Sequence, residues 1–147
     1  FYPESREVIT ENTAFLMANL LQGVVDEGTG RRLRFRYGFK NQIGGKTGTT
    51  QNHSDGWFIG ITPDLAGGVW VGAEDRSIHF QNLANGQGAS MALPIWALFM
   101  QKVYADKSLA VPQSDFQKPN GVNHVLDCGD ADREGMTDYD SSDEIFD

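Results

Sequence analysis

Apolar side chains fall at near-helical spacing in the first part of the chain. Within residues 7–26 they form one stripe from Phe15 onward, which predicts a helix that packs a single face against a core. Thr10 suits the N-cap of this helix, because its hydroxyl can accept a backbone N–H and Glu11 then lies in the first turn. Gly28 follows the last apolar position and predicts the end of the helix.

A second, almost continuously apolar segment covers residues 91–104 and predicts a buried helix. Pro94 is compatible with this helix if it falls at or near the first turn, where its missing N–H costs little. The preceding residues 81–90 are rich in Gly, Asn and Gln and predict a loop. Trp96 in the helix, and Trp70 further upstream, are expected to anchor the core.

Residues 31–40 alternate between apolar and basic side chains. The apolar positions are Leu33, Phe35, Tyr37 and Phe39, and the basic ones are Arg32, Arg34, Arg36 and Lys40. A period of two predicts a half-buried strand or ribbon. Its basic face is either simply solvated or attracts an anionic substrate.

Three further segments are typical of strands. Residues 43–50, 56–62 and 67–73 are short, and the last two are rich in aromatic and β-branched side chains. Pro63 and Asp64 form a turn signal between the second and third segments. We therefore expect an α+β fold with an N-terminal helix, a three-stranded antiparallel meander, a C-terminal helix and an acidic tail.

The composition changes after residue 105. We expect residues 1–105 to form one folded part and residues 106–147 a tail, broken by Pro and Gly and predicted to be disordered. From position 127 onward Arg133 is the single base among nine acids: Asp127, Asp130, Asp132, Glu134, Asp138, Asp140, Asp143, Glu144 and Asp147. The net charge of −8 argues against nucleic acid as a partner.

No cofactor or metal site is expected from the sequence. The segment 130–135 resembles the start of a calcium-binding loop, but the twelfth position holds Ser141 instead of Glu. His79 and His124 are too far apart to suggest zinc. The lone Cys128 excludes an internal disulfide.

The most informative chemistry lies in residues 44–50, which read Gly-Gly-Lys-Thr-Gly-Thr-Thr. Lys46 supplies a point charge, Thr47 and Thr49 supply hydroxyl donors, and Gly48 lets a ligand backbone approach closely. This combination suits a strand edge that binds a small carboxylate. It is not a Walker A loop, because the position five before Gly45 is Lys.

The neighbouring His53, Ser54 and Asp55 have the residue types of a catalytic triad. Neighbours in sequence rarely form one, because the three groups must converge from separate elements. We therefore predict a turn beside the motif strand.

Lys-Thr-Gly is an active-site element of penicillin-binding proteins and β-lactamases, and the flanks extend the likeness. Residues 3–105 resemble the C-terminal part of the transpeptidase domain of class A penicillin-binding proteins. The resemblance rests on the segments Gly23-Val24-Val25, Gly28-Thr29-Gly30, Asp55-Gly56-Trp57-Phe58, Val69-Trp70-Val71-Gly72 and Ala92-Leu93-Pro94-Ile95-Trp96. It implies a fragment of the β-lactamase/transpeptidase-like fold.

The resemblance also implies roles for the motif. Lys46 would supply positive potential beside the nucleophile, and the backbone N–H of Thr49 would donate to the oxyanion. Thr47, Gly48 and Thr49 would bind the substrate, with the two hydroxyls holding the carboxylate of a D-Ala-D-Ala stem peptide or a β-lactam. The parent would be a membrane-anchored serine D,D-transpeptidase on the extracytoplasmic side of the cell envelope, with a glycosyltransferase domain.

The nucleophile itself is not found here. The family places it in Ser-x-x-Lys, with a second motif Ser-x-Asn, and neither pattern occurs at any serine: Ser5, Ser54, Ser77, Ser90, Ser108, Ser114, Ser141 or Ser142. The chain also starts with Phe1. We therefore expect an inactive fragment that lacks the N-terminal part of its own domain, and that forms a dimer or swapped assembly.

Two alternatives stay open. A D,D-carboxypeptidase or β-lactamase-like hydrolase would use the same groups with water as the acceptor. A non-catalytic binding module would keep the fold without the chemistry. The residues upstream of Phe1 discriminate between enzyme and module.

Overall fold

The computed structural model of the chain describes residues 6–122. The acidic tail predicted from position 127 and the calcium-loop-like segment 130–135 therefore lie outside the described residues. No helix within residues 6–122 is long and apolar enough to cross a membrane.

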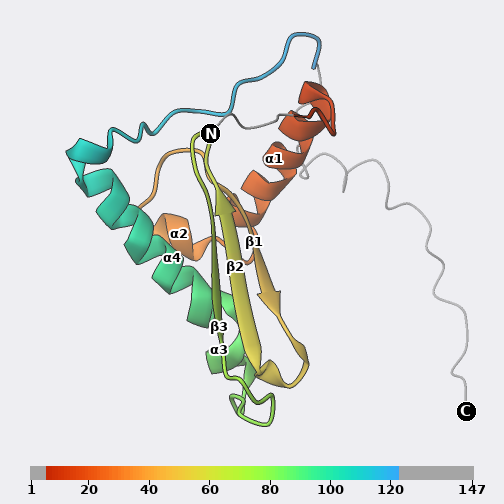
Figure 1. The fold of residues 1–147 in the computed structure, drawn as a ribbon, viewed down its shortest axis with the longest axis vertical. Helices are drawn as coiled ribbons and strands as arrows, with labels where there is room; N and C mark the ends of the chain where they lie inside the picture. The colour runs from red at the N-terminus through yellow and green to blue at the C-terminus, as the bar shows by residue number, and fades with distance from the viewer. Residues whose placement is uncertain (1–5, 123–147) are drawn as a thin grey trace, which may run out of the picture.

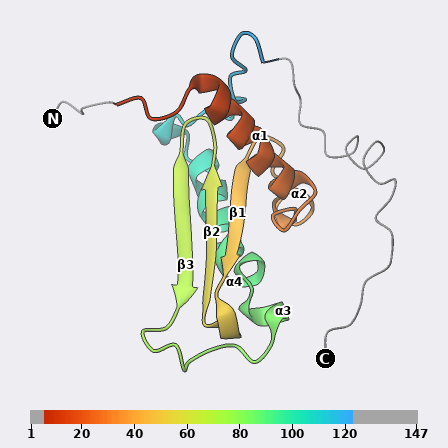
Figure 2. The same cartoon turned by 90° about the vertical axis from the view of Figure 1, so that its right-hand side faces the viewer.

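The fold is a three-stranded antiparallel sheet with helices packed on it (Figure 1). The strands follow one another in the order β1-β2-β3, which confirms the predicted meander. Their bounds are β1 Gly44–Thr49, β2 Asp55–Ile61 and β3 Ala66–Gly72. The helices are α1 Glu11–Asp26, α2 Arg32–Phe35, α3 Leu83–Gly86 and α4 Gly88–Ala105, with short 3-10 turns at Gln51–His53 and Lys107–Leu109. Figure 2 shows α1 and α2 beside β1, with β3 at the opposite edge of the sheet.

Helix α1 begins as its sequence predicts. The Thr10 hydroxyl accepts the backbone N–H of Thr13 at 3.3 Å, which satisfies one of the free donors of the first turn. At the other end the backbone N–H of Gly28 donates to Gly23 O at 3.1 Å. The buried Val25 then fixes the last turn of the helix against the core.

The core lies between the sheet and α4. Trp96 of α4 is 2% exposed and packs edge-on against Phe58 of β2, with ring centroids 5.4 Å apart. The indole also lies directly over Gly60, where an added Cβ would come within 2.4 Å of the ring. Any larger residue at position 60 would push α4 away from the sheet.

The alternating segment 31–40 is not a strand. Residues 32–35 form helix α2, so Leu33 is fully buried whereas Phe35 is 70% exposed. The guanidinium of Arg34 holds this shape, because it donates to Phe39 O at 3.1 Å and to Asn41 O at 2.6 Å. These local hydrogen bonds replace the strand ladder that a period of two predicts.

Helix α4 begins earlier than the apolar pattern predicts. It starts at Gly88, inside the segment expected to be a loop, and α3 occupies part of the same segment. Pro94 therefore lies within the helix and not in its first turn, so the carbonyl of Ser90 lacks its helical N–H donor. The early start reflects packing: a Cβ at position 88 would meet Gly48 O at 2.4 Å. Glycine lets the helix begin directly against the strands.

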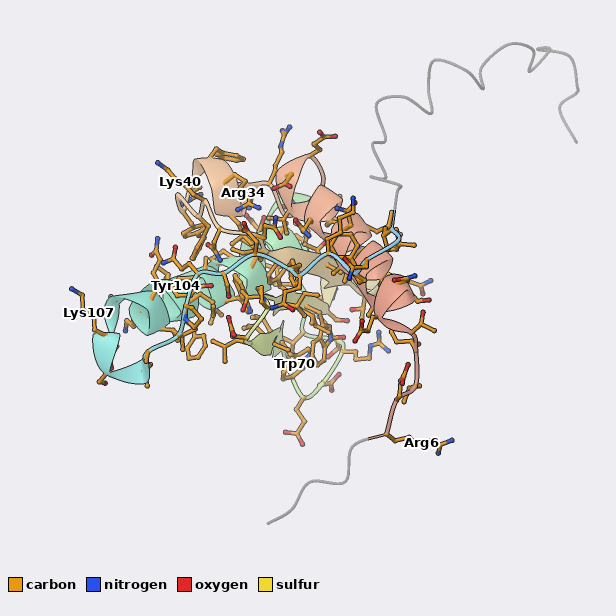
Figure 3. All side chains as sticks on the ribbon, turned by 90° about the horizontal axis from the view of Figure 1, so that it is seen from above. Arg6, Arg34, Lys40, Trp70, Tyr104 and Lys107 are labelled. Atoms are coloured by element: carbon orange, nitrogen blue, oxygen red, sulfur yellow. The ribbon has the colours of Figure 1, made fainter. Side chains whose placement is uncertain are left out.

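Trp70 does not anchor the core. It lies on the outer face of β3, is 47% exposed, and donates its indole N–H to Asp55 Oδ1 at 3.1 Å. Figure 3 shows Trp70 on the far side of the molecule from Arg34 and Lys40. Val69 and Val71 pack toward the core instead, because successive side chains of a strand point to opposite faces.

The segment after α4 returns along the top of the sheet (Figure 1). The Ser114 hydroxyl donates to Asp64 Oδ2 at 2.9 Å, and the backbone N–H of Phe116 donates to Gln42 Oε1 at 2.8 Å. Val122 is buried at the end of the described chain. Residues 107–122 therefore make specific contacts with the β2–β3 turn and the α2–β1 connection.

Removing the Arg34 side chain should destabilise the fold. Arg34→Ala leaves the carbonyls of Phe39 and Asn41 without their donor, and hydrogen bonds to a charged group are worth about 1.5–3 kcal/mol each. Because Arg34 is partly exposed, we expect a loss of about 1–3 kcal/mol in the free energy of unfolding, measured in urea. Lys40→Ala, an exposed cation nearby, is the control. Equal effects would contradict a structural role for Arg34.

Two glycine substitutions test the start of α4. Gly88→Ala forces a methyl group against strand backbone, so we expect a loss of about 1–3 kcal/mol in the free energy of unfolding. Gly23→Ala in α1 meets nothing within 4 Å and should instead gain about 0.5–1 kcal/mol, because alanine favours the helix. A gain at both positions would show that α4 does not begin against the strands.

Candidate functional site

The motif occupies β1, at the edge of the sheet opposite β3 (Figure 2). The backbone N–H of Thr50 donates to Asp55 O at 3.0 Å, which fixes the alternation of the ladder. In an antiparallel pair, residues alternate between facing the partner and facing away. The N–H and C=O groups of Lys46 and Gly48 therefore face β2, and those of Thr47 and Thr49 face away from the sheet.

Lys46 lies on the opposite face of β1 from the two threonines. Its side chain is exposed, and Nζ donates to the carbonyl of Thr47 at 2.7 Å. This bond draws the ammonium group to the outer edge of the strand. The positive charge therefore lies beside the same edge to which Thr47 and Thr49 turn their backbone groups.

The hydroxyl of Thr47 is held from outside the strand. Its Oγ1 lies 2.8 Å from Oγ1 of Thr29, in the turn between α1 and α2. Either hydroxyl can be the donor of this bond.

The hydroxyl of Thr49 has a different partner. Its Oγ1 accepts the backbone N–H of Gly88, the first residue of α4, at 3.1 Å. Because a backbone N–H can only donate, the Thr49 hydroxyl keeps its own proton for another acceptor. The bond also satisfies one of the free N–H groups at the start of α4.

A third contact joins the segments that hold these hydroxyls. Arg32 of α2 donates from Nη1 to Ala89 O at 2.9 Å and to Ser90 Oγ at 3.0 Å. The α1–α2 segment and the first turn of α4 are thus linked directly on the side of β1 that carries Thr47 and Thr49. The two hydroxyls lie on one connected support.

His53, Ser54 and Asp55 do not form a triad. The Ser54 hydroxyl lies 3.1 Å from Thr50 Oγ1 and donates to Asp55 Oδ2 at 3.2 Å, so it is engaged within the turn. His53 adopts a left-handed φ of 56°, and its buried Nδ1 has no hydrogen-bond partner among the described residues. Within residues 6–122, no three His, Cys, Asp or Glu side chains gather as metal ligands would.

The structure thus brings Lys46, Thr47, Gly48 and Thr49 to one edge, and it adds partners for which the sequence predicts no role at this motif. Thr29, Arg32 and Gly88 come from other elements; glycines mark the positions of Thr29 and Gly88 in the sequence, and Arg32 is marked only by the basic alternation of residues 31–40. Glycine tolerates close backbone approach, which is the one signal available before the tertiary contacts are known.

Comparison with known proteins agrees with this geometry. The family described as "Penicillin binding protein transpeptidase domain" matches residues 2–90. The chain is 36% identical to Penicillin-binding protein 1A of Pseudomonas aeruginosa over 125 residues, which cover 83% of this chain and 14% of that protein. It is 34% identical to Penicillin-binding protein 1A of Aquifex aeolicus over 117 residues, covering 80% of this chain and 15% of that one.

The structural comparison gives the same relationship. The fold superposes on the crystal structure of Penicillin-Binding Protein 1A from Haemophilus influenzae with a TM-score of 0.63 and 30% identity, covering 77% of this chain and 17% of that one. The chain thus spans between a seventh and a sixth of the length of these relatives. It belongs to the penicillin-binding protein transpeptidase domain family, among the penicillin-binding protein 1A-like members.

Proposed function

We propose that this chain is the substrate-binding C-terminal part of a serine D,D-transpeptidase domain that crosslinks peptidoglycan stem peptides and is acylated by β-lactams. The observation that carries the proposal is the edge of β1, where outward-facing backbone groups, two anchored hydroxyls and one ammonium group lie together. The parent protein is anchored in the membrane of the cell envelope, carries a glycosyltransferase domain, and exposes this domain on the extracytoplasmic side.

A stem peptide that ends in D-Ala-D-Ala lies along β1 as an added antiparallel strand. The N–H and C=O groups of Thr47 and Thr49 face away from β2 and suit such pairing. The Thr47 and Thr49 hydroxyls donate to the terminal carboxylate. The backbone N–H of Thr49 then donates to the oxyanion of the tetrahedral intermediate.

The covalent steps use a serine outside this sequence. Its oxygen attacks the carbonyl of the penultimate D-Ala, the terminal D-Ala leaves with a proton on its amine, and an acyl-enzyme forms. The amine of a neighbouring stem peptide attacks that ester, which completes the crosslink and releases the serine. The charge of Lys46 favours deprotonation of nearby groups and stabilises the developing negative charge. Residues 1–147 alone are inactive, because they lack the nucleophile.

Loss of the Lys46 charge should slow acylation. In the full-length protein, Lys46→Ala should lower the rate of labelling by a fluorescent penicillin by a factor on the order of 10² or more, as expected when a preorganised electrostatic group is removed. Lys40→Ala, an exposed lysine outside the motif, is the control and should label at the wild-type rate.

Two outcomes would contradict the proposed function. An acylation rate for Lys46→Ala within twofold of the wild type would mean that Lys46 is only a solvated side chain. A covalent penicillin adduct on residues 1–147 alone, detected by intact-mass spectrometry, would show that the chain holds a nucleophile of its own.

The rest of the same domain packs at the opposite edge of the sheet, beside β3. Beside β3, an apolar groove of about 580 Å³ runs between the strand and α4, lined by Val69, Ile95 and Phe99 among others. The outer edge of β3 also lacks a neighbouring strand among the described residues. An unpaired edge with apolar flanks favours pairing with another chain segment.

Residues 1–147 expressed alone should therefore self-associate as a dimer or swapped assembly through β3. A longer protein that includes the preceding part of the domain should not use this edge in that way. Light scattering at micromolar concentration measures the difference, and Val69→Lys should weaken the association by placing a charge in the groove. A monomer whose β3 amides are protected from hydrogen exchange would show that the chain covers the edge itself.

A further inference from the structure

We propose that Thr29 is a positioning residue for substrate binding: its hydroxyl orients the hydroxyl of Thr47 toward the carboxylate of the ligand. The inference rests on the proposed function and adds a residue from outside the Lys-Thr-Gly motif. It starts from the 2.8 Å contact between Thr29 Oγ1 and Thr47 Oγ1, two residues 18 positions apart in sequence.

The turn that carries Thr29 is held firmly. The backbone N–H of Gly30 donates to Val24 O at 2.9 Å, and that of Arg31 donates to Gly28 O at 3.2 Å. A Cβ at position 30 would lie only 3.1 Å from Val24 O, so the turn is packed tightly against the end of α1. Residues on both sides of the turn, Val25 and Leu33, are fully buried. The Thr29 hydroxyl is therefore presented from a rigid support.

The direction of the hydrogen bond decides what Thr47 offers a ligand. A hydroxyl has one proton and two lone pairs. If Thr47 donates to Thr29, it faces a carboxylate with lone pairs, which repel the negative charge. If Thr29 donates to Thr47, the Thr47 proton is free to donate to the carboxylate. A bound carboxylate therefore selects Thr29 as the donor.

The Thr49 hydroxyl is held in a similar way, but its hydrogen bond has only one possible direction. Its hydroxyl accepts from Gly88 N and keeps its proton, because that nitrogen can only donate. With Thr29 as the donor, both motif hydroxyls accept a hydrogen bond from their support and donate to the ligand. Without Thr29, the Thr47 hydroxyl rotates among its staggered positions, and orienting it costs part of the binding free energy.

The test uses the full-length protein and two substitutions at one position. Thr29→Val keeps the shape but removes the hydroxyl, and Thr29→Ser keeps the hydroxyl. We expect Thr29→Val to lower the second-order rate constant of acylation by benzylpenicillin by up to about tenfold, in line with the loss of one hydrogen bond between neutral groups. Thr29→Ser should stay within twofold of the wild type.

A matched control lies at the start of α1. Thr10 and Thr13 form a similar exposed hydroxyl pair, 2.9 Å apart, away from the motif. Thr13→Val removes one hydroxyl of that pair and should leave acylation unchanged. This control separates a positioning effect from the general effect of a Thr→Val change on the surface.

The methyl ester of benzylpenicillin distinguishes positioning from a merely structural role. The ester has no carboxylate for Thr47 to bind, so Thr29→Val should change its acylation rate less than twofold. In addition, the double substitution Thr29→Val/Thr47→Val should be no slower than Thr47→Val alone, because Thr29 acts through Thr47.

Each other result overturns the inference. An equal loss with the acid and the ester would assign Thr29 to the fold, and multiplicative losses in the double variant would show that it acts independently of Thr47. Wild-type protein that neither compound acylates would overturn the proposed function as well. Normal acylation of the wild type and of Thr29→Val alike would overturn only the role of Thr29.

Discussion

The contact between the Trp96 indole and the backbone of Gly60 is the constraint on which the rest of the structure depends. A side chain at position 60 would collide with the ring, so α4 reaches the sheet only because that position is bare. Phe58 and Phe39 then pack around the indole and close the core. With α4 fixed along its length, its first residue, Gly88, lies against β1, and the backbone N–H of Gly88 meets Thr49. Core packing and motif geometry are therefore parts of one arrangement.

The strands and the two long helices could be predicted from the sequence because each carries its own period and its own breakers. Residues 31–40 could not be predicted, because their alternation suggests a strand whereas residues 32–35 form a helix. The helical shape depends on Arg34, which donates to carbonyls five and seven residues away. The first residue of α4 could not be predicted from the sequence for a related reason. Glycine is a poor helix former, and only the tertiary contact of Gly88 with the strands outweighs that preference. Trp70 was expected in the core but is exposed, because the size of an apolar side chain alone does not decide its burial.

For the candidate site, the sequence specifies the chemical groups but not their supports. Lys46, Thr47 and Thr49 stand in seven consecutive residues, so their presence on one strand edge follows from local structure. Thr29 and Gly88 lie 18 and 39 positions from the hydroxyls they contact, and no period connects such distant positions. The Thr49 hydroxyl has a partner that can only donate, and the Thr47 hydroxyl has a partner that can donate or accept. Both contacts arise only in the folded structure. Only the support of Thr49 fixes the direction of its hydrogen bond, because a backbone N–H can only donate.

The two edges of the sheet have opposite character, and this difference bears on how long a bound strand stays. At β1 the flanking groups are hydroxyls and an ammonium ion, so a peptide there exchanges hydrogen bonds with water for hydrogen bonds with protein at a small net gain. At β3 the flanks are apolar, so a strand there also removes hydrocarbon from water. Under the proposed function a short occupancy suits the first edge, since a product would have to leave before the next peptide arrived. A long occupancy suits the second edge, because a strand bound there buries an apolar groove.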